Sequence, residues 1–323
     1  MMDLKYLPTT GVQLSALTLG TMMFGGQTDE SESLRIMDLA FERGVNSFDT
    51  ANVYNQGESE RITGLGLKGR RSRVVLATKV CGRMGTDPND SGLSRRSILA
   101  SAEDSLRRLG TDYIDIYYLH SPDSHTPVEE SLYAMDILIR SGKVRYAGIS
   151  NFAAWQAADI LHISDRRGYS APVVTQNVYN LLTRGIEAEF VPFLRAHPMG
   201  MAVYNPLAGG LLAGKHKKDK PEDNTRFALN KEYWRRYWSQ ENFTAVERLR
   251  TIAGESELNL LQLSYKWLAI QPEVSTVICG VSNLSQLEEN LGLLQGPQLN
   301  QQTLAACDEL WHSLAGTRFA YNR

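Results

Sequence analysis

The chain has 323 residues, of which 42% are hydrophobic and 22% charged, and it contains 14 Tyr, 9 Phe and 5 Trp. This composition excludes a disordered tail, a collagen-like fibre and a small disulfide-stabilised domain. The 34 Lys and Arg against 36 Asp and Glu leave a formal charge of −2, so neither nucleic acid nor an anionic membrane is an expected partner.

Targeting and redox features indicate a cytoplasmic protein. No apolar run approaches the roughly 18 residues of a membrane span. The N-terminal segment shows no secretory signal pattern, and we expect no long extension ahead of the first predicted element. Three cysteines without a CxxC pair indicate reduced thiols, at Cys81, Cys279 and Cys307.

Short β-branched or aromatic runs alternate with helix-period segments along the chain. A hairpin is predicted first, over Leu4–Leu7 and Val12–Leu14. Eight strands follow it, at Leu17–Leu19, Asn46–Asp49, Val74–Val80, Tyr113–His120, Val144–Ser150, Val173–Asn177, Met201–Tyr204 and Val274–Gly280. The accompanying helices are predicted at Ser31–Arg43, Ser59–Lys68, Ser94–Leu109, Val128–Arg140, Ala153–His162, Glu187–Ala196, Leu258–Ile270 and Leu284–Leu294.

Eight strands with helices between them are typical of an α/β fold of the (β/α)8 TIM-barrel type. No linker divides the chain, so residues 1–323 are predicted to form a single barrel domain with an N-terminal β-hairpin and a C-terminal helix at about Gln301–Leu314. The segment Pro206–Asn242 does not fit the repeat, because it is longer than an ordinary loop. Its aromatic residues predict packing, and they are Phe227, Tyr233, Trp234, Tyr237 and Trp238.

Polar or special residues stand at the carboxyl ends of seven predicted strands, the rim where barrel enzymes place their chemistry. A single residue of this kind is often only structural, but their coincidence on one rim predicts an active site. The positions are Asp49, Lys79, His120, Ser150, Asn151, Gln176, Asn177, Tyr204 and Gly280–Ser282.

Tyr54, five residues after Asp49, suggests that this site reduces a carbonyl by hydride transfer. The alkoxide that forms needs a proton, and a tyrosine phenol suits this task when a nearby ammonium such as Lys79 lowers its pKa. Asp49 would keep Lys79 charged, and His120 would hydrogen-bond the substrate oxygen. Taken singly, Asp49 as a helix cap, Tyr54 as surface packing and Lys79 as a solvated strand end remain open alternatives.

Two segments are candidates for phosphate binding. Gly64–Gly69 matches G-x-G-x-x-G, but it ends a predicted helix and precedes a strand, whereas the dinucleotide fingerprint follows a strand and opens a helix. We interpret its glycines as a helix stop and close packing sites. Cys279–Asn283 is better placed, because it leads from the eighth strand into a helix N-terminus. An ordinary helix cap is the alternative there.

A metal site is not predicted. His120 and His125 flank Asp123 in one loop, but the further ligands expected at a barrel metal centre are missing. The remaining histidines show no matching pattern, and they are His162, His197, His216 and His312.

From about Leu4 to Leu294 the chain resembles the aldo-keto reductases, with separate motifs in family order and at family spacing. These motifs are Leu19–Met22, Phe48–Ala51, Tyr54, Glu58–Glu60, Thr78–Lys79, Ser101–Leu109, Asp112–Asp115, Leu119–His120, Gly142–Tyr146, Gly148–Asn151, Gln176, Tyr204, Pro206–Lys215 and Gln286–Asn290. The most similar branch includes bacterial general aldo/keto reductases and potassium-channel β subunits. The resemblance implies a barrel with the hairpin under its floor and NADP(H) extended across its mouth.

The resemblance assigns Tyr54 as the acid, Lys79 and Asp49 as its tuning pair, and His120 as the group that orients the substrate. It implies that the cofactor is held by Gly20, Thr21, Met22, Asp49, Ser150, Asn151, Gln176, Tyr204, Asn205, Pro206, Leu207, Ala208, Gly210, Lys215, Arg226, Gly280, Ser282, Gln286, Glu289 and Asn290. The carboxamide would lie near Ser150, Asn151 and Gln176, the nicotinamide ring on Tyr204, and the adenosine end on the residues from Gly280 onwards.

The chain departs from the family pattern at Cys279, where proline is common, and at Asn205, where serine is common. No Lys or Arg occurs from Gly280 to Asn290, so a positive contact to the 2′-phosphate must come from elsewhere, with Arg226 as the candidate. NADP(H) is still favoured over NAD(H).

The predicted function is reduction of aldehydes or ketones, including sugars, to alcohols. Two alternatives stay open: a redox-sensing cofactor-binding subunit, and an aldose- or hydroxysteroid-type dehydrogenase working mainly in oxidation. The partner is a small carbonyl or alcohol substrate, and the oligomeric state is not predicted. Candidate substrate contacts are Met22, Phe24, Met84, Asp123 and residues 227–238.

Overall fold

The computed structural model describes residues 2–214, 216, 221, 226–229 and 231–316, with the side chains of residues 227 and 228 only in the range 226–229. Residue contacts divide the chain into two units. Unit 1 comprises Met1–Asn177, Ala188–Tyr204 and Glu273–Leu291, and unit 2 comprises Val178–Glu187, Asn205–Pro272 and Gly292–Arg323.

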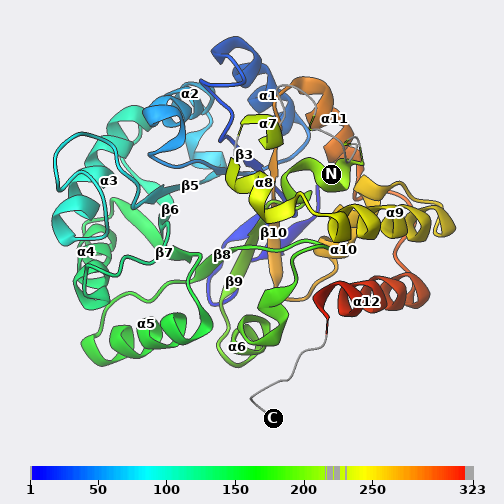
Figure 1. The fold of residues 1–323 in the computed structure, drawn as a ribbon. Helices are drawn as coiled ribbons and strands as arrows, with labels where there is room; N and C mark the ends of the chain where they lie inside the picture. Colours follow the sequence, from blue (N-terminus) through cyan, green and yellow to red (C-terminus); the bar gives the residue numbers. More distant parts are fainter. Residues whose placement is uncertain (1, 215, 217–220, 222–225, 230, 317–323) are drawn as a thin grey trace. The chain divides into compact units, whose positions relative to one another are not determined.

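Eight parallel strands form a closed barrel, and all but the last residue of β8 belong to unit 1 (Figure 1). The order around the barrel is β10-β3-β4-β5-β6-β7-β8-β9. The strands are β3 (Leu17–Gly20), β4 (Ser47–Asp49), β5 (Val75–Val80), β6 (Ile114–Leu119), β7 (Val144–Ser150), β8 (Val174–Val178), β9 (Gly200–Tyr204) and β10 (Val274–Gly280). The predicted (β/α)8 TIM barrel is therefore confirmed.

The helices of unit 1 alternate with these strands, and Figure 1 shows α1 to α5 around the outside of the barrel. Side-chain caps fix their starts where the sequence supplies them, as Asp29 does for α1 and Ser94 for α3. The helices are α1 (Glu30–Glu42), α2 (Glu58–Gly66), α3 (Arg95–Leu109), α4 (Val128–Arg140), α5 (Ala154–Arg167), α6 (Phe190–Ala196) and α11 (Leu284–Gly292).

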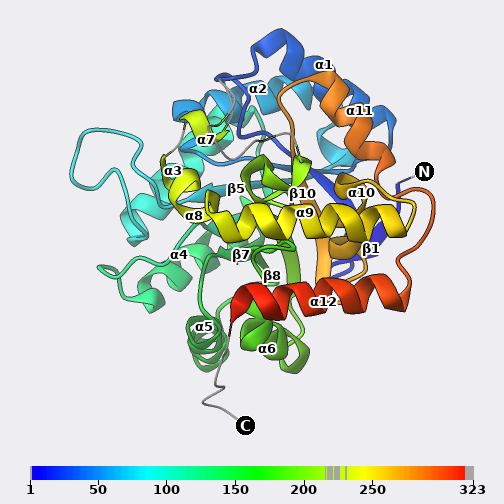
Figure 2. The same cartoon turned by 45° about the vertical axis from the view of Figure 1, so that its right-hand side comes forward.

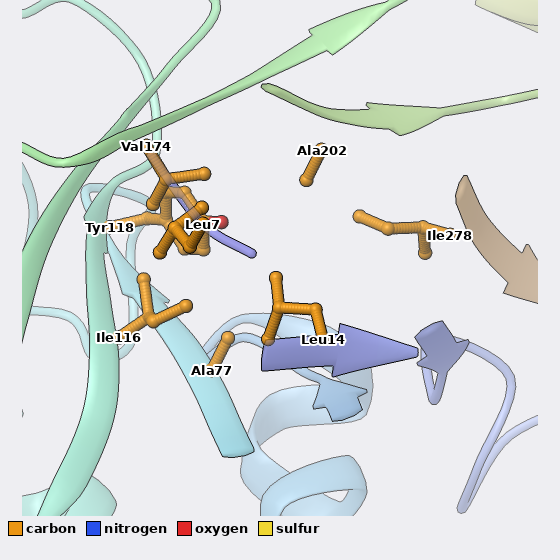
Figure 3. Close-up of a cluster of buried hydrophobic side chains, with 8 residues drawn as sticks. All are labelled: Leu7, Leu14, Ala77, Ile116, Tyr118, Val174, Ala202 and Ile278. Carbon is orange, nitrogen blue, oxygen red and sulfur yellow. The ribbon is translucent and has the colours of Figure 1, made fainter. Parts of the chain in front are cut away.

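The hairpin of β1 (Leu4–Tyr6) and β2 (Gln13–Ser15) contributes to the barrel core. Leu7 and Leu14 are buried among inward-facing strand residues, as Figure 3 shows. Those strand residues are Ala77, Ile116, Tyr118, Val174, Ala202 and Ile278. These apolar side chains fill the end of the barrel interior next to the hairpin. The opposite end, formed by the carboxyl ends of the strands, is where barrel enzymes place their chemistry, and it carries the polar side chains.

The G-x-G-x-x-G segment ends α2, as the sequence predicts. A Cβ at Gly64 would lie 2.3 Å from the carbonyl oxygen of Leu109 at the end of α3. Gly69 then has a φ of 77°, a left-handed conformation that glycine adopts readily. The glycines therefore serve close helix packing and a turn before β5.

The segment predicted as an excursion, Pro206–Asn242, contains the 3-10 helix Ala208–Ala213, α7 (Arg226–Leu229) and α8 (Lys231–Tyr237), and the long helix α9 (Gln240–Glu255) that begins at its end was not predicted. The other helices of unit 2, α10 (Leu260–Ala269) and α12 (Gln301–Ala315), were predicted at Leu258–Ile270 and about Gln301–Leu314. A further 3-10 helix covers Gly185–Ala188. The polar composition of α9 hides a narrow apolar stripe, of which Val246, Leu249 and Ile252 are buried. The expected aromatic packing is present, since Trp234 stacks on Trp238 at 4.5 Å between ring centroids.

Candidate active site

Lys79 is the charged centre of the site. It lies fully buried on β5, and its Nζ donates to Asp49 Oδ1 and, at 2.7 Å, to the Thr50 carbonyl oxygen. The Tyr54 hydroxyl lies 3.5 Å from the same nitrogen. Burial acts to lower the pKa of Lys79, but the electrostatic interactions and hydrogen bonds with Asp49 and Tyr54 raise it overall. A buried ammonium therefore stands beside a phenol.

Tyr54 is placed by an unusual turn. It begins the 3-10 helix Tyr54–Gly57, in which Asn55 and Gln56 have φ values of 48° and 56°. Such left-handed residues are uncommon outside glycine. The Asn55 Nδ2 donates to the carbonyl oxygens of Met22 and Phe24 at 3.0 and 2.8 Å, which holds the turn against the preceding loop. The sequence predicts Tyr54 over the barrel mouth, but it gives no sign that Asn55 holds the turn.

His120, the residue after β6, faces Tyr54. The two ring centroids lie 6.1 Å apart in an edge-on arrangement. Burial first, and the charge of Lys79 second, lower the pKa of His120 to about 3. The imidazole is therefore neutral near neutral pH and brings no positive charge to the site.

One hydrogen-bond network joins the predicted carboxamide-binding residues to Asp49. The Tyr204 hydroxyl donates to Asn151 Oδ1 at 2.7 Å, and Asn151 Nδ2 donates to Ser150 Oγ at 3.0 Å. The Ser150 hydroxyl donates to the Gln176 carbonyl oxygen at 3.0 Å, and Gln176 Nε2 donates to Asp49 Oδ2 at 2.8 Å. The sequence analysis grouped these residues on one rim but missed the contact between Gln176 and Asp49.

Comparison with known proteins identifies the family. The Aldo/keto reductase family model matches residues 16–312. The chain belongs to this family.

Relatives from three kingdoms share most of their length with this aldo/keto reductase. It is 38% identical to the "Probable voltage-gated potassium channel subunit beta" of Arabidopsis thaliana over 297 residues, which cover 90% of each chain. It is 36% identical to the human "Aflatoxin B1 aldehyde reductase member 2" over 319 residues, or 93% of this chain and 87% of the relative. It is 38% identical to the "Uncharacterized oxidoreductase YrpG" of Bacillus subtilis (strain 168) over 303 residues, covering 90% of each.

This aldo/keto reductase is accordingly an NAD(P)H-dependent oxidoreductase whose general reaction is carbonyl reduction. Membership of the family also makes a nicotinamide cofactor and a small-molecule carbonyl substrate its general reactants. None of the helices described in the structure is long and apolar enough to span a membrane.

The first predicted cofactor contacts of the reductase are the last residue of β3 and the two residues after it. Gly20 packs against β10, where a Cβ would lie 2.8 Å from Ile278 Cγ2. The Thr21 side chain is buried, and its hydroxyl lies 2.9 Å from that of Ser59. Met22 is exposed. Of these three, Met22 is the one whose side chain is open to a ligand.

The predicted adenosine site lies at the end of β10 and the start of α11, next to α1 in both views of the reductase (Figure 2). Gly280 is exposed, and a Cβ at this position would have no other atom within 4 Å. The Ser282 backbone N–H and hydroxyl donate to Gln286 Oε1 at 3.0 and 3.2 Å. The N–H of Leu284 donates to Glu32 Oε1 at 2.8 Å. A carboxylate from α1 thus occupies this helix N-terminus, and the sequence analysis missed it.

The last two predicted adenosine contacts of the reductase differ in exposure. Asn290 is buried, and its Nδ2 donates to Cys279 Sγ at 3.2 Å. Cys279 stands where the family commonly has proline, and this contact gives it a partner. Glu289 is exposed on the same helix.

The predicted cofactor loop of the reductase lies at the start of the second segment of unit 2, Asn205–Pro272. Asn205 has a φ of 60°, donates to the Tyr237 hydroxyl at 2.8 Å and accepts from the Gly209 N–H at 2.6 Å. These contacts give the asparagine that replaces serine a structural role. Pro206–Gly210 follow, with Ala208 buried at a φ of 50°. Lys215 and the side chain of Arg226 lie outside the described residues.

Two of the substrate-contact candidates in the reductase have other roles. Phe24 is fully buried, so its side chain packs inside the protein and is not open to a substrate. The Asp123 carboxylate accepts from the backbone N–H groups of Leu93 and His125 and from the Thr126 hydroxyl, at 2.8, 2.9 and 2.8 Å. Asp123 therefore orders its own loop.

Proposed function

We propose that this reductase converts aldehydes or ketones, including sugars, to alcohols with NADPH, and that Tyr54 is the general acid. The observation that carries the proposal is the buried Lys79 ammonium, fixed by Asp49 and 3.5 Å from the Tyr54 hydroxyl. A surface-packing role for Tyr54 would not need a buried cation at its hydroxyl.

The residues present fit a nicotinamide cofactor, because one network of polar side chains leads to the Asp49–Lys79 pair. It runs from the half-buried Tyr204 and the exposed Asn151 to the buried Gln176, which donates to Asp49. The bound cofactor supplies the hydride that adds to the carbonyl carbon. Tyr54 gives its proton to the carbonyl oxygen, so that C=O becomes CH–OH. Lys79 stabilises the phenolate that remains, and the neutral His120 imidazole hydrogen-bonds the substrate oxygen.

The preference for NADPH over NADH is a finer part of the proposal. The Glu32 carboxylate, which lies at the N-terminus of α11, should weaken the binding of the 2′-phosphate by charge repulsion. Replacing Glu32 with glutamine is expected to tighten NADPH about fivefold and to change NADH less than about twofold. A unit charge about 4 Å from another is worth about 1 kcal/mol in water, and the 2′-phosphate is the charge that NADH lacks. Binding is measured by quenching of protein fluorescence with each cofactor, and with 2′,5′-ADP as a cofactor fragment.

Glu30→Gln is the matched control for this experiment. Glu30 lies in the same first turn of α1, but it pairs with Arg61 at 2.5 Å and not with α11. If Glu32→Gln lowered the Kd of NADPH and of NADH equally, Glu32 would affect only the helix and would not interact with the 2′-phosphate.

Metal dependence gives a second test of the hydride-transfer mechanism. Exhaustive treatment with EDTA is expected to leave kcat unchanged, because every step assigned above uses a side chain or the nicotinamide. Within the described ranges there is no group of three or more His, Cys, Asp or Glu side chains suited to a metal ion. Activity lost to the chelator and restored by zinc or manganese would overturn the mechanism.

A second candidate function follows from the plant relatives, whose names describe potassium-channel β subunits. A cofactor-bearing subunit that senses redox state would bind NADPH but turn over aldehydes slowly. A panel of aldehydes, ketones and sugars, followed by NADPH oxidation and by the reverse reaction with alcohols, separates the enzyme from the subunit and fixes the favoured direction.

A further inference from the structure

The loop that follows β3 is fixed at both of its ends. At the start, the Thr21 N–H donates to the Asp49 carbonyl oxygen at 2.9 Å. At the end, the buried Thr28 donates through its hydroxyl to the Ser282 carbonyl oxygen at 3.0 Å. Between them the Phe24 side chain is fully buried. The loop is therefore a firm support that is attached to β4, the strand of Asp49, and to the segment after β10.

Asn55 is the residue that binds the Tyr54 turn to this loop. Both hydrogens of its amide nitrogen are used, one for the Met22 carbonyl oxygen at 3.0 Å and one for the Phe24 carbonyl oxygen at 2.8 Å. Gly26 packs on the same amide, because a Cβ there would lie 2.6 Å from Asn55 Oδ1. The left-handed backbone of Asn55 is one that asparagine tolerates better than most residues.

We propose that Asn55 is a positioning residue of this reductase: it holds the Tyr54 hydroxyl beside the Lys79 ammonium by fastening the turn to the loop after β3. The inference rests on the proposed role of Tyr54 as the acid. The hydroxyl lies 3.5 Å from Lys79 Nζ, at the outer limit of a hydrogen bond, so this contact alone fixes the phenol only weakly. A turn bound to a support that also contacts Asp49 keeps the acid and the Asp49–Lys79 pair together.

Loss of this attachment has a directional consequence for the proton of Tyr54. A neighbouring ammonium favours the phenolate, so a phenol that spends less time beside Lys79 loses its proton at higher pH. The pKa of His120, whose ring faces Tyr54, is about 3, so this group does not titrate in the same range. The other charged groups around the site and the turn are left in place by the substitutions below, and they are Asp49, Glu58, Glu60, Arg61 and Arg108.

Two glycine substitutions isolate the hydrogen bonds of Asn55. Asn55→Gly removes the amide but leaves a residue that adopts the left-handed conformation readily. Gln56→Gly is the matched control, because Gln56 is also left-handed, with a φ of 56°, but is exposed and has no side-chain hydrogen bond to another described residue. Neither substitution changes the charge of the turn. A difference between the two variants therefore comes from the Asn55 amide.

Gly26→Ala disturbs the same amide from the side of the loop. Gly26 does not have a left-handed φ, so the backbone accepts alanine, and the added methyl group meets Asn55. Gly11→Ala is the control for this variant, since Gly11 has no left-handed φ either and a Cβ there would have no other atom within 4 Å. In this pair of variants Asn55, Tyr54 and Lys79 are all retained.

The experiment measures the reduction of one aldehyde by these variants across the pH range, with a substrate for which chemistry limits kcat. For Asn55→Gly we expect kcat to fall about fivefold, the rate equivalent of one ordinary hydrogen bond. The alkaline limb of its pH–kcat profile should move to higher pH. The Kd for NADPH should change less than about twofold, because the loop keeps its attachments at Thr21 and Thr28. Gly26→Ala should move the alkaline limb in the same direction, and both controls should match the wild type.

A crystal structure of Asn55→Gly gives a readout that is independent of activity. It should show the Tyr54 hydroxyl displaced from its position 3.5 Å from Lys79 Nζ. An alkaline limb that stays in place in Asn55→Gly, or that moves equally in Gln56→Gly, would overturn the positioning role. If Asn55→Gly does not give folded protein, Gly26→Ala decides in its place, and an unmoved limb in that variant overturns the role.

Failure of the underlying function is distinguishable from failure of this inference. If Tyr54→Phe keeps the wild-type kcat, Tyr54 is not the acid, and the expected change in the pH profile loses its basis. The crystal structure of Asn55→Gly still decides whether Asn55 holds the phenol at Lys79, and a Tyr54 hydroxyl that stays in its wild-type position there overturns the inference by itself.

Discussion

Replacing Tyr54 with phenylalanine is expected to lower kcat for aldehyde reduction about 10²- to 10⁴-fold, which is the usual contribution of a general acid. The effect should be large because burial lowers the pKa of His120 to about 3, so its imidazole is neutral near neutral pH, and the N–H of a neutral imidazole is a much weaker acid than a phenol. The Kd for NADPH should stay within about twofold, since the hydroxyl is assigned to the substrate. Steady-state kinetics and fluorescence titration measure the two quantities.

Tyr133→Phe serves as the control for this substitution, because Tyr133 lies exposed on α4 and has no part in the site. The assay must use a substrate for which chemistry limits kcat, as shown by an isotope effect with deuterated NADPH. A Tyr54→Phe enzyme with the wild-type kcat under those conditions would refute the acid assignment.

Replacing Arg108 with methionine is expected to destabilise the protein by about 3–5 kcal/mol, the cost of leaving a buried charge without its partner. Glu60 on α2 is fully buried; it accepts from Arg108 Nε at 2.7 Å and from the Thr78 hydroxyl at 2.6 Å. Arg108 lies on α3, so the pair joins two helices to β5. Unfolding in guanidinium chloride, with the slope compared between variants, measures the loss.

Arg107→Met is the matched control, because Arg107 is the neighbouring arginine but is 76% exposed and pairs with an exposed Asp104. Exposed pairs of this kind contribute little. Adding Glu60→Gln to Arg108→Met should recover part of the loss, since the double variant no longer buries an unpaired charge. A single Arg108→Met variant as stable as Arg107→Met would contradict a structural role for the pair.

Local pattern was sufficient to predict the barrel. The period-2 and helix-period runs depend on neighbouring residues, and the strands and helices of unit 1 appear close to their predicted bounds. A prediction from local pattern also fails where the pattern is weak. The helix α9 was not predicted because its first turns are polar and its apolar stripe is narrow. The sequence shows the glycines near the end of α2 and predicts a helix stop there. Only the packed structure shows that Gly64 on α2 lies against Leu109 at the end of α3.

Sequence alone determined the fold class and the set of polar residues at the barrel mouth, because strand alternation and the common rim of parallel strands follow from local order. Only the tertiary structure decided which of those residues touch. Gln176 and Asp49 are 127 residues apart in the chain, and Leu284 and Glu32 are 252 apart. No local propensity encodes such pairs: they arise when barrel closure brings strands and helices together, and the burial that follows makes each unpaired polar atom costly.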